Sequence, residues 1–221
     1  MPGEALKIKG FAGLPPKWAI CKSYINQQLA LNNWPKQFLK PVIGLERDGT
    51  ILQDDEEFIF SPSQVRPLPN ALEAIKMMRL KGYKVVILTN QSGISKGKLT
   101  QEQVDTVNNH MMKIFGEAGI FSIDGLYYAT SDLKEDLFAK PNTGMFNRAK
   151  NELKIDWKKG WYVGDKISDL KAGFKAGAKP ILVKTGQGNL TIEKLNTFAN
   201  KELKEQTKIF NNLLEFANSL P

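Results

Sequence analysis

Two acidic residues, Glu46 and Asp48, stand directly after an apolar run in the stretch 42-VIGLERDGTI-51 of this 221-residue sequence. Two carboxylates separated by one residue suit phosphoryl transfer. The first can attack phosphorus as a nucleophile, and the second can protonate the leaving oxygen and later deprotonate water. The length of the first side chain sets the point from which it attacks, and here that residue is a glutamate.

Three further polar groups follow along the chain, and each has a role in phosphoryl transfer. They are Thr89-Asn90-Gln91, Lys140-Pro141, and Asp165 with Asp169 in 164-GDKISD-169. A threonine hydroxyl at a strand end and the backbone N–H groups after it can hold phosphate oxygens, and a lysine can neutralise charge on the transferring group. Asp165 together with Glu46 offers the oxygen ligands that Mg²⁺ prefers.

Each group also has an ordinary explanation when it is taken alone. An Asp-Gly-Thr sequence is usually a turn, 89-TNQ-91 can be a polar loop, and Lys140 can be a solvated lysine. Asp165 and Asp169 can simply complement the positive end of a helix dipole. All four groups in this order, each after a predicted strand, instead indicate one catalytic site.

The pattern of apolar residues predicts strands that alternate with helices. Strands are expected at 42–45, 84–90, near 125–129, 160–165 and 179–186, and helices at 70–80, 101–117, 143–153, 167–176 and near 203–219. This alternation predicts an α/β fold with a single doubly wound, Rossmann-like parallel sheet and helices on both faces. Ligands of such folds bind at the carboxyl ends of the strands, where the polar groups lie.

Residues 1–40 are predicted to be a basic, partly helical extension in front of a domain over 41–221. Residues 1–15 are expected to be irregular, and the apolar spacing over 16–33 predicts an amphipathic helix. The extension holds six lysines and one acid, so it carries five of the eight net positive charges. It has no arginine and no basic cluster interleaved with aromatics, so we expect a solvated arm and no nucleic-acid partner.

Composition indicates an ordinary globular chain, with 42% hydrophobic and 24% charged residues. No apolar run approaches the ~20 residues of a membrane span, and the N-terminus lacks the apolar core of a secretory signal. A single cysteine, Cys21, excludes an internal disulfide. We therefore expect a cytoplasmic protein with no membrane partner; the sequence does not predict its oligomeric state.

Over about residues 42–190 the sequence resembles the haloacid dehalogenase superfamily, in the branch of D-glycero-D-manno-heptose 1,7-bisphosphate phosphatase and histidinol-phosphate phosphatase. The motifs in family order are E-R-D-G-T-I, V-V-I-L-T-N-Q-S-G-I-S-K-G-K-L-T, D-G-L-Y-Y, K-P-N-T-G-M-F and Y-V-G-D-K-I-S-D-L-K-A-G. The resemblance implies no large cap domain and a Mg²⁺-dependent site. Its implied residues are Glu46 at the nucleophile position; Asp48 as general acid/base and carbonyl ligand; Thr89, Asn90, Gln91 and Lys140 for the phosphoryl group; Asp165 for Mg²⁺; and Asp169 in support.

The sequence departs from that branch at three places. Glu46 stands where the family has Asp, which adds about 1.5 Å of reach. The stretch 128–141 contains no Cys or His, so no zinc is expected, and Asp132, Glu135 and Asp136 are interpreted as a solvated loop. Ala139 replaces an Arg beside the lysine. Lys96 and Lys98 in the loop after Gly93 are candidate substitutes for that charge, with plain solvated lysines as the alternative.

These observations predict a Mg²⁺-dependent phosphomonoester hydrolase acting on a small sugar phosphate, most like the heptose 1,7-bisphosphate 7-phosphatases. The alternative is a pseudo-phosphatase that binds a phosphate ligand or a protein partner without turnover, because Glu46 replaces the nucleophilic Asp. A nucleic-acid end phosphatase is a third and weaker hypothesis, since the basic excess lies outside the core.

Overall fold

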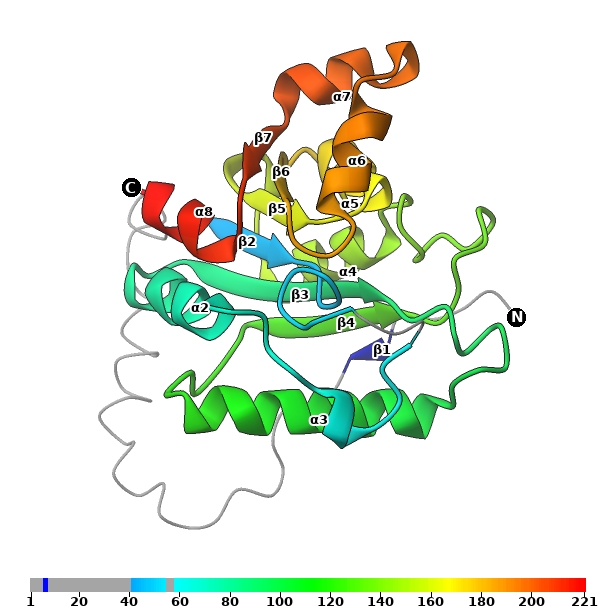
Figure 1. Cartoon of the computed structure of the whole chain (residues 1–221), viewed down its shortest axis with the longest axis vertical. Helices are drawn as coiled ribbons and strands as arrows, with labels where there is room; N and C mark the ends of the chain where they lie inside the picture. Colours follow the sequence, from blue (N-terminus) through cyan, green and yellow to red (C-terminus); the bar gives the residue numbers. More distant parts are fainter. Residues whose placement is uncertain (1–5, 8–40, 55–57) are drawn as a thin grey trace.

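The computed structural model describes residues 6–7, 41–54 and 58–221, and its centre is a seven-stranded sheet of order β1-β4-β3-β2-β5-β6-β7 (Figure 1). The strands are β1 (Leu6–Lys7), β2 (Val42–Leu45), β3 (Lys84–Asn90), β4 (Gly125–Ala129), β5 (Trp161–Gly164), β6 (Lys179–Val183) and β7 (Lys208–Phe210). Strands β2 to β7 are parallel, which confirms the predicted sheet.

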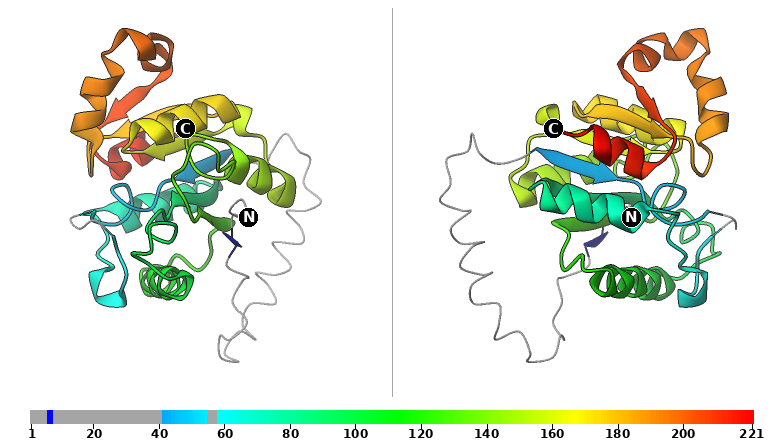
Figure 2. Two further views of the ribbon diagram at one scale, coloured as in Figure 1. Left: turned by 90° about the vertical axis from the view of Figure 1, so that its right-hand side faces the viewer. Right: turned by 60° about the vertical axis from the view of Figure 1, so that its left-hand side comes forward.

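Helices cover both faces of this sheet (Figure 2). One face carries α2 (Ala71–Leu80), α3 (Gln101–Glu117) and α8 (Leu213–Ser219), and the other carries α4 (Gly144–Leu153) and α5 (Ile167–Ala176). Successive strand residues point to opposite faces. In β3, Val85 and Ile87 pack under the first group of helices, whereas Val86 and Leu88 pack under the second. Both faces are buried, which explains the continuous apolar strand sequences.

Local sequence signals set several helix ends. Thr100 caps α3, because its side chain accepts a hydrogen bond from the backbone N–H of Gln103 at 3.1 Å. Gly82, with φ of 84°, follows the end of α2 as predicted. Gly177, with φ of 89°, ends α5 in the same way.

The C-terminal region differs from the single helix expected near 203–219. It forms α7 (Lys201–Gln206), strand β7 and helix α8. Pairing of β7 with β6 interrupts the helical pattern, and α8 then packs on α2. Lys81, directly after α2, donates to the carbonyl of Leu220 at 2.6 Å, and the Tyr83 hydroxyl donates to that of Pro221 at 3.0 Å. Tertiary pairing therefore overrides the local preference.

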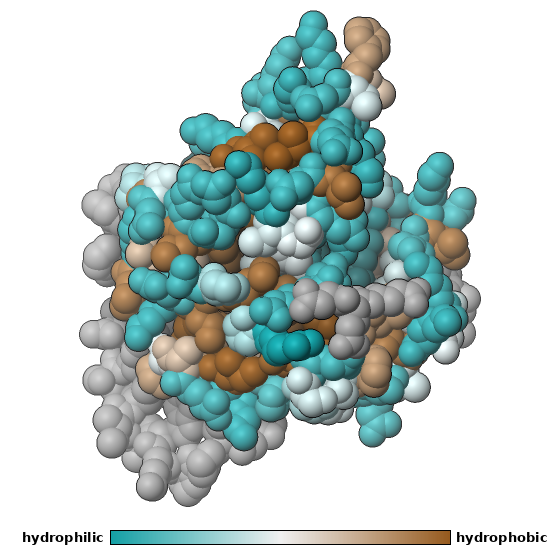
Figure 3. Space-filling view, in the orientation of Figure 1, coloured by the Kyte–Doolittle hydropathy of each residue, from teal (hydrophilic) through white to brown (hydrophobic). Residues whose placement is uncertain are grey.

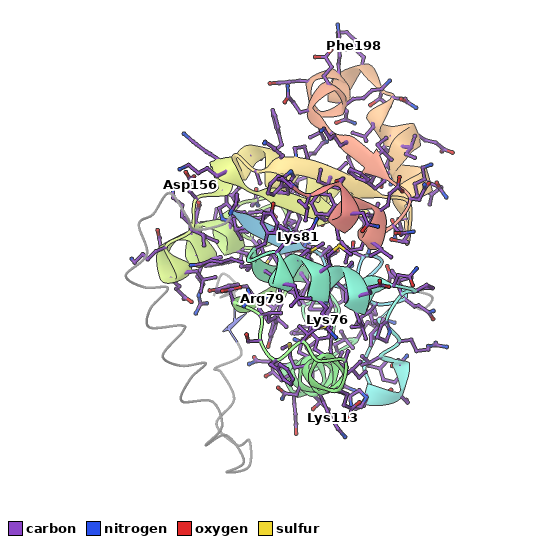
Figure 4. All side chains as sticks on the ribbon, turned by 90° about the vertical axis from the view of Figure 1, so that its left-hand side faces the viewer. Lys76, Arg79, Lys81, Lys113, Asp156 and Phe198 are labelled. Atoms are coloured by element: carbon purple, nitrogen blue, oxygen red, sulfur yellow. The ribbon has the colours of Figure 1, made fainter. Side chains whose placement is uncertain are left out.

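Helix α6 (Gly188–Leu195), the 3₁₀ turn η5 (Phe198–Asn200) and α7 form a projection beyond β6 (Figure 1). Of these, α6 and η5 were not predicted, whereas α7 overlaps the start of the helix expected near 203–219. Hydrophilic side chains cover much of it (Figure 3). Phe198 lies at its outer end with 92% of its surface exposed (Figure 4). The first helix of the projection begins beside the carboxyl end of β5, where Thr191 of α6 donates to the carbonyl of Asp165 at 2.7 Å.

The N-terminal predictions are tested only at β1. Leu6–Lys7 pairs antiparallel with β4, so the expectation of an irregular segment is wrong for these two residues. The helix predicted over 16–33 lies outside the described residues, and the boundary near residue 40 stays a prediction. Between Thr50 and Leu68 the described residues form the turn η3 (Pro62–Gln64) and loops, without a cap domain. Within the described ranges no helix has the length and apolarity needed to cross a membrane.

Candidate active site

Three neighbouring strands deliver the predicted site residues to one edge of the sheet. Glu46 follows β2 directly, Thr89 and Asn90 end β3, and Asp165 follows β5. Strand β2 lies between β3 and β5, and from it the chain builds the sheet outward in both directions. This is the switch point at which open α/β sheets bind their ligands.

The Glu46 carboxylate is buried, with 4% of the residue exposed. Its Oε1 accepts a hydrogen bond from the Thr89 hydroxyl at 2.7 Å. Its Oε2 forms an ion pair with the Lys140 ammonium. Thr89 and Lys140 are therefore brought together as predicted, and both contact the residue at the nucleophile position.

Lys140 comes from the loop between β4 and α4 and reaches across to β2 and β5. Besides Glu46, its ammonium bonds Asp169 Oδ1 at 2.7 Å and the Tyr162 hydroxyl oxygen at 2.8 Å. Tyr162 in turn donates to the carbonyl of Leu88 at 2.6 Å. Burial lowers the pKa of Lys140, while the charge of Asp169 opposes that effect. Tyr162 was not predicted, and a tyrosine inside a strand has no distinctive sequence signal.

Asn90 has a different position from the one expected of a phosphate ligand. Its Nδ2 donates to the carbonyl of Lys140 at 3.1 Å, and the Lys140 N–H donates to its Oδ1 at 2.9 Å. Asn90 thus holds the backbone of Lys140 beside β3. This pair of bonds supports a positioning role, and direct contact with phosphate stays a prediction.

Arg47, which sequence reasoning treated as a spacer, is fully buried. Its Nε and Nη2 donate to the two carboxylate oxygens of Asp48 at 2.7 and 2.9 Å. Nη2 also donates to Gln91 Oε1 at 2.9 Å, and Nη1 donates to Asn108 Oδ1 at 2.7 Å. Asn108 was missed too, although it is a polar residue within the apolar stripe of α3 and therefore left a signal.

Gln91 links the Asp48 network to the Glu46 network. Its Nε2 donates to Asp48 Oδ2 at 3.0 Å and to Thr89 Oγ1 at 3.1 Å. Burial acts to raise the pKa of Asp48, but Arg47, Gln91 and a nearby lysine hold it below its usual value. Asp48 is therefore a carboxylate that stays ionised and oriented.

Asp165 is completely buried, and its two oxygens differ. Oδ2 accepts the backbone N–H of Gln187 at 2.8 Å, whereas Oδ1 has no hydrogen-bond partner in the described part of the chain. Burial, with a contribution from Asp169 and opposition from Lys166, raises the pKa of Asp165 to about 7. An unpartnered buried carboxylate oxygen is the arrangement that a cation ligand requires.

Two glycines let the backbone approach Asp165. A Cβ added at Gly49 or at Gly186 would lie 2.3 Å from Asp165 Oδ2, and both residues have positive φ. The described residues contain no group of three or more His, Cys, Asp or Glu suited to a metal. Mg²⁺ commonly binds one or two carboxylates and completes its shell with water and phosphate oxygens. The Asp165 carboxylate fits that pattern, whereas Glu46 and the Asp48 carbonyl stay predictions as further ligands.

Asp169 bonds both Lys140 and the start of α5, and its supporting role stays a prediction. Its Oδ1 pairs with Lys140, and its Oδ2 accepts the backbone N–H of Lys166 at 2.9 Å at the start of α5. Lys166 extends to Asp54 Oδ2 at 3.0 Å and so connects the α5 terminus to the loop after β2.

Lys96, a predicted substrate ligand, is exposed and pairs with Asp132 at 2.7 Å. The structure does not show it among the contacts of Glu46 or Asp48. Asp132 and Glu135 are exposed as predicted, but Asp136 is only 6% exposed, so the interpretation of a fully solvated loop is wrong there. Asp136 Oδ1 accepts the backbone N–H of Phe138 at 2.9 Å, which folds the loop inward.

Comparison with known proteins agrees with this geometry. Residues 42–212 match the family described as polynucleotide kinase 3 phosphatase. Curated relatives include the D-glycero-beta-D-manno-heptose-1,7-bisphosphate 7-phosphatases of Neisseria meningitidis, at 32% identity over 80% of this chain and 92% of the relative, and of Pseudomonas putida, at 31% over 80% and 97%.

Solved structures give the same result. The D,D-heptose 1,7-bisphosphate phosphatase of B. bronchiseptica, crystallised with magnesium and phosphate, has a TM-score of 0.71 at 27% identity over 81% of this chain and 96% of that one. The enzyme of Burkholderia thailandensis has a TM-score of 0.59 at 29% identity over 81% and 97%. The chain belongs to the polynucleotide kinase 3 phosphatase family, within the haloacid dehalogenase superfamily of phosphatases.

Proposed function

We propose that this chain is a Mg²⁺-dependent phosphomonoester hydrolase acting on a small phosphorylated sugar, most like D-glycero-D-manno-heptose 1,7-bisphosphate. The observation that carries the proposal is the convergence of Glu46, Thr89 and Lys140 at the end of β2. The ordered carboxylate of Asp48 lies beside them in sequence. Relatives at 31–32% identity are named for this heptose bisphosphate, which supports the substrate class.

In this proposal the Glu46 carboxylate attacks phosphorus, the ester P–O bond breaks, and an acyl phosphate forms. Asp48 is the assigned general acid and base. Its lowered pKa favours the carboxylate, which can remove a proton from the water that hydrolyses the acyl phosphate. To protonate the leaving oxygen in the first step, Asp48 has to take up a proton when the substrate binds. Lys140 and Thr89 stabilise the charge on the transferring group. Mg²⁺, held by Asp165 and the Asp48 carbonyl, would supply further charge neutralisation when bound.

A specific observation favours the alternative of a pseudo-phosphatase. Both oxygens of Glu46 are already bonded, one to Thr89 and one to Lys140. In addition, misplacement of a reacting atom by about 1 Å can cost about 10²-fold in rate. Under this alternative the site binds a phosphate ligand or partner, and turnover is absent.

The test is phosphate release in the presence of Mg²⁺, measured for the full chain, Glu46→Asp and Asp48→Asn. The panel contains the heptose bisphosphate, histidinol phosphate, an aryl phosphate and a 3′-phosphorylated oligonucleotide. We expect turnover of a sugar phosphate that Asp48→Asn abolishes and Glu46→Asp increases modestly. A chain without turnover that Glu46→Asp activates would establish the pseudo-phosphatase, and preference for the oligonucleotide would reassign the substrate class.

A further inference from the structure

The two donors assigned to the phosphoryl group have no free proton in the structure. A threonine hydroxyl has one proton, and that of Thr89 is directed to Glu46 Oε1 at 2.7 Å. An ammonium has three protons. Those of Lys140 are shared among four acceptors: Glu46 Oε2, Asp169 Oδ1, the Tyr162 oxygen and, at 3.0 Å, the carbonyl of Leu88. A phosphate oxygen can bind here only if one of these acceptors leaves.

Glu46 is the acceptor that can leave. Asp169 is also tied to the backbone N–H of Lys166 at 2.9 Å, and Tyr162 to the carbonyl of Leu88 at 2.6 Å. Both would lose a second bond on moving. Among the described residues, the carboxylate of Glu46 is bonded by Thr89 and Lys140, with a longer 3.4 Å contact to the Tyr162 hydroxyl. Its movement would free the Thr89 proton and vacate the position beside the Lys140 ammonium, which would keep its bonds to Asp169, Tyr162 and the Leu88 carbonyl.

We propose that the Glu46 carboxylate occupies the anion site of this protein, defined as the position that faces Thr89 Oγ1 and Lys140 Nζ. An incoming phosphate has to displace it. The inference rests on the proposed function, because it uses the same phosphate ligands. It adds that Glu46 is an affinity-determining residue, and that the extra methylene weakens phosphate binding as well as shifting the point of attack.

An aspartate at position 46 keeps the charge but withdraws the carboxylate by about 1.5 Å. A hydrogen bond of 2.7 Å stretched by that amount is no longer a hydrogen bond. Glu46→Asp should therefore free the Thr89 proton and open the position beside the Lys140 ammonium to an external anion. The net charge does not change in this variant. Tighter phosphate binding would therefore result from the shorter side chain at position 46 and not from weaker electrostatic repulsion.

The test is isothermal titration of the full chain with inorganic phosphate in MgCl₂. We expect Glu46→Asp to bind phosphate at least about tenfold more tightly than the unaltered chain, corresponding to the release of charge-assisted hydrogen bonds. Glu117→Asp is the matched control, because Glu117 is an exposed glutamate 3.9 Å from Lys113. Its affinity should equal that of the unaltered chain.

A second variant covers the case in which Glu46→Asp does not fold. In Glu46→Ala the anion site is open, so acetate should compete with phosphate for it. In the unaltered chain acetate should not compete. Both titrations are made at the same chloride concentration. The proposal is wrong if Glu46→Asp binds phosphate within twofold of the unaltered chain, or if acetate does not compete in Glu46→Ala. Sugar-phosphate turnover together with either result would leave the proposed function standing, whereas no phosphate binding and no turnover in any variant would overturn both.

Discussion

Replacing Arg47 with methionine should destabilise the fold strongly, because a buried guanidinium holds three side chains. The change removes both bonds to Asp48 and leaves Gln91 Oε1 and Asn108 Oδ1 without this donor. Breaking a buried ion pair by removing one partner costs about 3–5 kcal/mol. Each lost donor to a buried acceptor adds about 1–3 kcal/mol. These costs should not add in full, because the Asp48 side chain is 15% exposed and can recruit water. We therefore expect Arg47→Met to lower the free energy of unfolding by about 3–5 kcal/mol.

The measurement is urea unfolding in Mg²⁺-free buffer, so that ligand binding does not contribute. The matched control is Arg148→Met, the same substitution at an arginine whose ion pair with Glu152 is about one-third exposed on α4. It should cost less than about 1 kcal/mol. The double variant Arg47→Met/Asp48→Asn should recover part of the loss, because the unpaired carboxylate is then neutral.

Equal costs for Arg47→Met and Arg148→Met would refute the reasoning. The reasoning would also fail if the double variant lost more free energy of unfolding than the two single variants lose together. The Asp48 carboxylate would then not be the charge that Arg47→Met leaves unpaired. A reduced m-value in Arg47→Met would instead indicate loss of two-state unfolding.

Two further predictions concern Gly186 and Tyr128. Gly186→Ala should lose the rise in Tm that MgCl₂ produces, because the new Cβ would lie 2.3 Å from Asp165 Oδ2. The control Gly97→Ala should keep that rise, because Gly97 also has a positive φ but its new Cβ would have no atom within 4 Å. A rise in Tm with MgCl₂ in both variants would contradict the metal assignment. Burial and Asp105 raise the pKa of Tyr128 above 10.0, so its stabilising contribution is complete below pH 10 and is lost as the pH rises further. Between pH 8 and 10.5 the unaltered chain should lose about 0.8 kcal/mol more than Tyr128→Phe in urea unfolding, and equal losses would exclude this linkage.

Most strands were predictable because burial on both faces demands uninterrupted apolar runs. The runs at 42–45 and 84–90 became β2 and β3. The polar groups after them were then placed at one edge of the sheet by the direction of parallel strands alone. The tail was not predictable, because Lys208–Phe210 becomes a strand only when β6 is available beside it.

The contacts of the site residues were less predictable than their location. Asn90 and Lys140 both reach the site, but Asn90 bonds the backbone of Lys140. Lys96 bonds Asp132 on the surface. Sequence order cannot separate a ligand from a residue that positions one, since both are polar and both follow strands.

The α/β class and the parallel sheet could be predicted from the sequence, because the periodicity of apolar residues is a local property. The acidic residues of the site could be predicted because they directly follow predicted strands. The tertiary structure alone decided that Arg47 is buried against Asp48 and that Glu46 already holds Thr89 and Lys140. Those contacts join residues up to 94 positions apart. They depend on side-chain length and on which protons remain after internal bonding, and no local pattern encodes either quantity.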